Sequence, residues 1–134
     1  MSSATRAMLW TVLFALTLPV GATAQKPQGL LAVSLRINNS KSDGVLAIVD
    51  PAAGKVIGRI PIAEDPHGLT VSPDGRFAFI AHSNGDTVSM IDIPARKEIH
   101  RVHLGVRSEP HDIHVSGGKV LFTVEGYKSL ARFD

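Results

Sequence analysis

Apolar residues in most of this chain form short runs, separated by turns that contain Gly, Pro, Asn or Asp. No segment after residue 25 shows an apolar stripe of helical period over ten or more residues. The pattern predicts ten strands, at residues 30–36, 45–50, 55–62, 67–72, 76–82, 87–93, 98–104, 111–116, 119–125 and 129–134. Short strands joined by tight turns indicate an all-β antiparallel meander.

Several of these strands carry apolar residues on both faces. In strand 87–93, Val88 and Met90 lie on one face, while Ile91 and Ile93 lie near the other. A sheet with one face in water would alternate apolar and polar residues more cleanly. The pattern therefore predicts sheets that are covered on both sides by neighbouring sheets.

The chain also repeats itself. Pro66-His67 recurs as Pro110-His111, 44 residues later, and aspartates end equivalent strands 42 residues apart, at Asp50, Asp92 and Asp134. A period near 42 residues with four strands per unit is typical of propeller blades. The sequence thus predicts antiparallel four-stranded blades, about two and a half in number: a partial blade at 30–62, a full blade at 67–104 and a partial blade at 111–134.

The segment "DPHGLTVSPDGRFAFIAHSNGDTVSMIDIPARKEI", residues 65–99, resembles the YVTN-type β-propeller repeat, which is related to the seven-bladed lactonase-like propellers. Here "FAFIAHSNGDTVSMIDI" stands where that repeat has a "YVTN" strand, a small-residue turn and a strand ending in "VIDT". The resemblance covers Leu30 to Asp134, and the third copy departs from it, with "GG" in place of "PDG".

The resemblance implies a repeat protein that acts as a binding or scaffold module, and its export is predicted separately from residues 1–24. The alternative is that the chain is part of a lactonase-like hydrolase, or part of a redox propeller that carries a cofactor in a channel site. The sequence identifies neither the cofactor nor a catalytic residue. Because propellers host many unrelated activities, the fold alone does not choose between them.

His67 and His111 are the candidate ligand-binding residues, because they occupy the same position in consecutive repeats. In the family this position looks toward the central channel, so two imidazoles would face one ligand or metal. The alternative is that Pro-His simply fits the bend into the inner strand. The pairs His100/His103 and His111/His114 are not expected to chelate a metal, because residues three apart on a strand point to opposite sides. His82, at a strand end, is expected at the surface.

The repeated aspartates are interpreted as turn residues, not catalytic carboxylates, since Asp accepts hydrogen bonds from the backbone that follows it. Asp74, in the "SPDG" turn, is expected to act in the same way. No carboxylates are paired for acid–base work, and neither a G-x-S-x-G motif nor a phosphate-binding Gly loop is present in the sequence.

Composition removes further classes of function. Fourteen Lys and Arg against twelve Asp and Glu give a formal charge of +2, too even to favour nucleic acid. The absence of cysteine excludes disulfides, Cys-ligated metals and thiol catalysis.

The first 24 residues are predicted to be a secretory signal peptide. Arg6 precedes an apolar run too short to span a bilayer, and Ala22 and Ala24 form an A-x-A cleavage signal. Residues 25–29 form a polar lead-in. The mature protein is expected in the periplasm or outside the cell, with no membrane span. It is also expected to be a truncated propeller, whose partners are further blades from the same or another chain, besides a small-molecule or protein ligand.

Overall fold

The computed structural model describes residue 29 and residues 31–36 and 44–134. Each predicted strand is present, with ends within one residue of the prediction, and a short 3₁₀ helix, η1 (Glu125–Tyr127), follows β9. The strands are β1 (Leu31–Arg36), β2 (Gly44–Asp50), β3 (Lys55–Ile62), β4 (Pro66–Val71), β5 (Phe77–His82), β6 (Thr87–Asp92), β7 (Lys97–His103), β8 (Pro110–Ser116), β9 (Lys119–Val124) and β10 (Ser129–Phe133).

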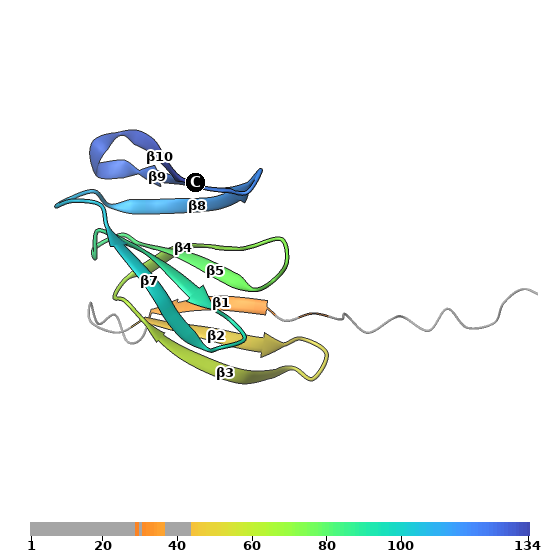
Figure 1. Ribbon diagram of the computed structural model, residues 1–134. Helices are drawn as coiled ribbons and strands as arrows, with labels where there is room; N and C mark the ends of the chain where they lie inside the picture. Colours follow the sequence, from red (N-terminus) through yellow and green to blue (C-terminus); the bar gives the residue numbers. More distant parts are fainter. Residues whose placement is uncertain (1–28, 30, 37–43) are drawn as a thin grey trace, which may run out of the picture.

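The strands form three antiparallel sheets in chain order. Sheet 1 is β1-β2-β3, sheet 2 is β4-β5-β6-β7, and sheet 3 is β8-β9-β10. Figure 1 shows them stacked, with sheet 2 between the other two. The prediction of an all-β fold of partial propeller blades is confirmed. By the repeat, sheet 1 corresponds to the second, third and fourth strands of a blade, and sheet 3 to the first, second and third.

Sheet 2 is apolar on both faces. Successive side chains of a strand point to opposite sides, and in β5 and β6 apolar residues occupy both sets of positions. Ala78 and Ile80 of β5 belong to a cluster shared with sheet 1, whereas Ala81, on the same strand, belongs to a cluster shared with sheet 3. In β6, Ile91 lies in the first cluster and Val88 in the second, as the sequence predicts. The middle sheet is therefore held by burial on two sides, the main favourable term in folding.

The aspartates fix turns. Asp50 Oδ1 accepts hydrogen bonds from the amides of Ala52 and Ala53, at 2.9 and 3.0 Å, and Asp92 Oδ1 accepts one from Ala95 N at 2.9 Å. Asp74 Oδ1 accepts from Arg76 N at 3.0 Å. The interpretation of Asp50, Asp92 and Asp74 as turn residues is thus confirmed, whereas for Asp134 it stays a prediction.

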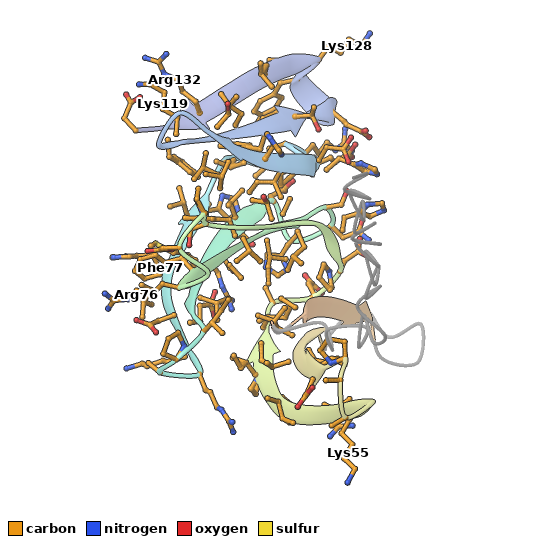
Figure 2. The ribbon with its side chains drawn as sticks, turned by 90° about the vertical axis from the view of Figure 1, so that its right-hand side faces the viewer. Lys55, Arg76, Phe77, Lys119, Lys128 and Arg132 are labelled. Atoms are coloured by element: carbon orange, nitrogen blue, oxygen red, sulfur yellow. The ribbon has the colours of Figure 1, made fainter. Side chains whose placement is uncertain are left out.

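A basic residue recurs at nearly the same period as the aspartates, and it pairs with an aspartate in each of sheets 2 and 3. Arg76 Nη2 lies 3.3 Å from Asp92 Oδ2 in sheet 2, and in sheet 3 the equivalent Lys119 pairs with Asp134, whose Oδ1 is also 3.3 Å from Arg132 Nε. Figure 2 shows Arg76 and Lys119 on the same side of the stack. Corresponding ends of the two sheets are therefore aligned.

The predicted signal peptide and most of the polar lead-in lie outside the described residues. Within the part that the structure describes, no helix is long and apolar enough to cross a membrane.

Candidate functional site

A repeated bend positions the two candidate histidines. Asp65 and Glu109, each just before a proline, have positive φ angles of 48° and 49°. Their carbonyls accept matching hydrogen bonds, from Ser83 N to Asp65 at 3.1 Å and from Glu125 N to Glu109 at 3.2 Å. The same backbone conformation thus begins β4 and β8, and it presents the second residue of each strand at the same end of the stack.

His67 and His111 lie against each other. Their ring centroids are 3.7 Å apart and their planes are inclined by 37°. Gly68 allows this approach, because a Cβ at that position would lie 2.2 Å from the carbonyl oxygen of His111. The structure therefore brings the two predicted site residues together, and a ligand role for them stays a prediction.

Two carboxylates that were not predicted from the sequence as site residues lie beside this pair. Nδ1 of His111 is 3.6 Å from both Asp112 Oδ1 and Glu125 Oε1, beyond hydrogen-bond length, and has no hydrogen-bond partner among the described residues. Glu125 comes from η1, which follows β9 rather than β8. Its closeness to His111 follows from the pairing of β8 with β9, so the linear sequence offers only a weak signal for it.

Among the described residues, no group of three or more His, Asp and Glu side chains is arranged so that it could hold a metal ion. The His67–His111 pair can offer ring nitrogens and ring faces to a ligand, and its neighbours offer carboxylate oxygens.

The expectation that His82 lies at the surface is wrong: its side chain is fully buried. His82 continues the series of Ala78 and Ile80, which point from β5 toward sheet 1. Its Nδ1–H donates to the carbonyl of Glu64 at 3.0 Å, and its Nε2 lies 2.9 Å from Ser89 Oγ. Both ring nitrogens therefore have partners, which is what permits burial of a polar ring.

Ser89 connects His82 to the outer strand β7 through Glu98. Ser89 Oγ lies 2.6 Å from Glu98 Oε1, and Arg101 donates to both oxygens of Glu98, at 2.8 and 2.6 Å. Because the Glu64 carbonyl can only accept, Nδ1 of His82 carries the proton and neutral Nε2 is an acceptor. The one hydroxyl proton of Ser89 therefore has two acceptors, His82 and Glu98.

Burial lowers the pKa of His82 to about 4. Burial alone would raise the pKa of Glu98, but hydrogen bonds from Arg101 and Ser89 outweigh it and lower that pKa. His82 is thus neutral and Glu98 ionised near neutral pH. We interpret this network as structural, because it joins the interior of sheet 2 to its outer strand.

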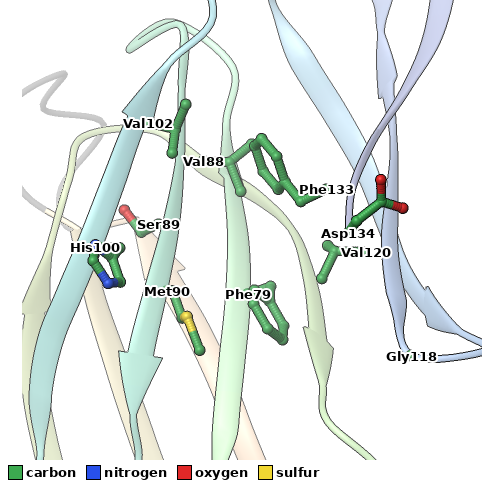
Figure 3. Close-up of a pocket in the computed structure, with 10 residues that line it drawn as sticks. All are labelled: Phe79, Val88, Ser89, Met90, His100, Val102, Gly118, Val120, Phe133 and Asp134. Carbon is green, nitrogen blue, oxygen red and sulfur yellow. The ribbon is translucent and has the colours of Figure 1, made fainter.

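A separate feature lies between sheets 2 and 3, on the side of β7 and β10. It is a cavity of about 300 Å³ with a largely apolar lining. Figure 3 shows Phe79, Val88, Met90 and Val102 from sheet 2 facing Val120 and Phe133 from sheet 3. This cavity was not predicted from the sequence, because it depends on how far each sheet extends outward.

Sheets of this kind, stacked face to face in chain order, are blades of a β-propeller. Among solved structures, the chain is similar to hydrazine synthase of Kuenenia stuttgartiensis, a protein that contains a propeller, with a TM-score of 0.53 and 25% sequence identity. The match covers 60% of this chain and 25% of that one, so the chain spans about a quarter of its length. No family model matches the chain and no curated protein is similar to it in sequence, so the resemblance to the YVTN repeat stays a prediction.

Proposed function

We propose that this chain is part of an exported β-propeller that acts as a binding module, with its site at the ends of the inner strands β4 and β8. The observation that carries the proposal is the contact of His67 with His111, at 3.7 Å between ring centroids. Two titratable rings from equivalent positions of consecutive blades offer one ligand two adjacent groups. A small number of convergent polar groups is typical of ligand-binding sites.

The surroundings favour a ligand that carries hydrogen-bond donors or positive charge. Asp112 is 83% exposed and Glu125 is 54% exposed, so both can turn toward a ligand. A small cation, an amine or a basic protein segment fits this chemistry.

Zinc ion is the probe that tests the site, since neutral imidazole and carboxylate are its common ligands. We expect a His67→Ala, His111→Ala double variant to lose most of the zinc affinity of the wild type, measured by calorimetric titration. His114→Ala is the matched control, because His114 is exposed on the same strand, and it should bind as the wild type does. Equal affinity of the wild type and the double variant would leave the pair only a structural role.

Export is supported by the A-x-A pattern at Ala22–Ala24, behind an apolar run. Intact-mass measurement of protein from the exported fraction should give a chain that begins at Gln25. Retention of Met1 in that fraction would contradict export through a cleaved leader.

The scaffold part of the proposal is that further blades pack against this chain. Its support is the exposure of apolar side chains such as Leu130, 69% exposed on sheet 3. Size-exclusion chromatography with light scattering should show self-association or a shallow melt for the purified mature chain. A monomer of about 12 kDa, the size of a small domain, with a sharp cooperative melt would contradict it.

A further inference from the structure

We propose that a polar cavity between the outer strands of sheets 1 and 2 binds a small zwitterion of the amino-acid class. Arg101 holds the carboxylate of this ligand, and Glu64 and Thr87 hold its ammonium group. The site shares no residue with the histidine pair. Both outer strands that border it, β3 and β7, are present in the structure.

The polar cavity has a volume of about 320 Å³ and a mostly polar lining. Its walls come from the end of β3 and the loop after it, from the turn between β5 and β6, and from β7. Cavities that bind small ligands have volumes of about 300–1,000 Å³, so this one suits a small molecule. The residues that line it are Ile62, Ala63, Glu64, Gly85, Thr87 and Arg101.

The residues behind the polar cavity depart from the repeat. His82, Ser89 and Glu98 form a hydrogen-bonded network that ends on Arg101. Burying polar groups is costlier than burying apolar ones, and departures from a locally consistent pattern are expected at functional sites. At the corresponding positions of the neighbouring sheets, the strand registers place apolar residues, namely Val124 for His82, Ala47 and Ala131 for Ser89, and Val56 for Glu98. The network, specific to sheet 2, holds Arg101 in place at the wall of the cavity.

Arg101 can bind a second carboxylate in addition to that of Glu98. Glu98 accepts hydrogen bonds from Nε and Nη2, so it occupies one edge of the guanidinium plane. The Arg101 side chain is 45% exposed, and its Nη1 donates to no described residue. A guanidinium has more N–H donors than one carboxylate can use, and it binds carboxylates through paired hydrogen bonds. The remaining edge can therefore hold the carboxylate of a ligand.

Glu64 and Thr87 supply acceptors for an ammonium group. Thr87 is 7% exposed, and its hydroxyl has no hydrogen-bond partner among the described residues. A Cβ added to Gly85 would lie 3.5 Å from this hydroxyl and 3.6 Å from Cγ of Glu64, so Gly85 leaves the space between them open. A buried hydroxyl without a partner costs free energy, and an ammonium group that donates to it would recover that cost.

The charges around the polar cavity favour a zwitterion over a simple anion or cation. Arg101 is already paired with Glu98, and Glu64 adds a second carboxylate. An anion would lie beside the Glu64 carboxylate and be repelled, whereas the ammonium group of a zwitterion attracts it. A simple cation would leave the remaining donors of Arg101 without an acceptor.

The test is an NMR titration of the whole mature chain with glycine, β-alanine and 4-aminobutyrate, whose charged groups lie progressively further apart. We expect at least one of them to bind saturably, with shifts of the amide signals of Gly85 and Thr87 and of the Arg101 Nε–H signal. Acetate and methylammonium are the matched control ligands, because each carries only one of the two charges. Each should bind at least about tenfold more weakly, since it lacks one set of charge-assisted hydrogen bonds.

Two variants test the assigned roles. Arg101→Lys keeps a positive charge beside Glu98 but lacks the second edge of N–H donors, so it should weaken binding about tenfold. Glu64→Gln should weaken binding by a similar factor, and because it keeps the shape of the side chain and the carbonyl that accepts from His82, it should fold. Glu109→Gln is the control variant and should bind as the wild type does, because Glu109 lies in the next loop between sheets, away from the cavity.

Three results would overturn the inference. They are the absence of saturable shifts with every zwitterion, binding of acetate as tight as that of the zwitterions, and unchanged affinity in Glu64→Gln. The His67→Ala, His111→Ala double variant should bind the zwitterion as the wild type does. Loss of zinc binding with retention of zwitterion binding, or the reverse, therefore separates failure of the histidine site from failure of this site.

Discussion

Ile60 and Val102 occupy equivalent positions in the outer strands of sheets 1 and 2, yet Ile60 is 2% exposed and Val102 is 42% exposed. The residues are similar in chemistry, so the difference lies in what covers them. Ile60 faces a sheet of four strands, whereas Val102 faces a sheet of three. The comparison shows that the outer strand of one blade covers the outer part of the blade before it.

Sheets 2 and 3 also differ in their inner strands, β4 and β8. Sheets 2 and 3 meet closely there because Gly68 of β4 lies against the backbone of β8. The equivalent residue of sheet 3 is Asp112, whose side chain is 83% exposed. The open face of sheet 3 therefore carries an exposed carboxylate where the corresponding face of sheet 2 has a glycine in contact with β8.

The largest expected effect comes from Gly68→Ala. Its Cβ would lie 2.2 Å from the carbonyl oxygen of His111 and 3.1 Å from Cα of Asp112, so the two inner strands would have to separate. We expect a loss of about 4 kcal/mol or more in the free energy of unfolding, measured by urea denaturation. Gly58→Ala is the control, because its nearest neighbour is the flexible side chain of Arg96 at 3.4 Å, and it should change stability by less than about 1 kcal/mol. Similar losses in both would show that β4 and β8 do not meet as described.

Next in size is the contrast between the two outer strands. Ile60→Ala should cost about 3 kcal/mol, because it opens a cavity in a packed interface. Val102→Ala should cost less than about 1 kcal/mol, because Val102 already borders open space. Urea denaturation of both variants gives the two values. Equal losses would mean that the outer cavity is closed in solution.

The pH dependence of stability tests the buried network between sheets 1 and 2. Burial lowers the pKa of His82 from 6.5 to about 4, so the unfolded chain binds this proton more readily than the folded one. The stability that this group contributes is present above pH 6.5 and is lost as the pH falls from 6.5 to about 4, by about 3 kcal/mol in total.

His82→Gln removes the titrating group, so its stability should vary less with pH over this range. Thermal or urea unfolding of the two proteins between pH 7 and pH 4 supplies the comparison. Parallel pH profiles for the wild type and His82→Gln would show that another group is responsible.

A smaller effect is expected where the chain passes from sheet 2 to sheet 3. Asp86 accepts hydrogen bonds from Arg107 N at 2.8 Å, Glu109 N at 3.0 Å and Ser108 Oγ at 3.2 Å, and it has a φ of 51°. Burial alone would raise the pKa of Asp86, but these hydrogen bonds together lower it.

Asp86→Ala should therefore cost about 1–2 kcal/mol in the free energy of unfolding. Asp86→Asn should cost less, because Asn tolerates positive φ and can still accept hydrogen bonds. Denaturation of both variants checks the order, and a larger loss for Asn than for Ala would contradict this account of the loop.

Much of the fold could be predicted from the sequence because each local feature agrees with the repeat. The alternation in β5, the "SPDG" turn at Asp74 and the aspartates 42 residues apart all indicate the same blade. The repeat also indicated that His67 and His111 hold equivalent positions, since their spacing follows its period.

The burial of His82, the position of Glu125 and the outer cavity could not be predicted, because they depend on contacts between residues that are distant in the sequence. His82 is buried because Glu64 and Ser89 satisfy its two nitrogens, and neither is recognisable as a partner from spacing. Glu125 approaches His111 only through the pairing of β8 with β9. The outer cavity depends on the absence of a fourth strand from sheet 3 among the described residues, which becomes meaningful only when the sheets are stacked.

Hydrogen exchange measured along the whole chain tests most directly the claim that sheet 2 is covered on both sides and that sheet 3 is open at its outer edge. The slowest amides should lie in β5 and β6, which have paired strands on both edges and packed sheets on both faces. Amides of β10 should exchange faster, because one of its edges and one of its faces are open. Protection of β10 equal to that of β5 and β6, in the chain alone, would contradict the account.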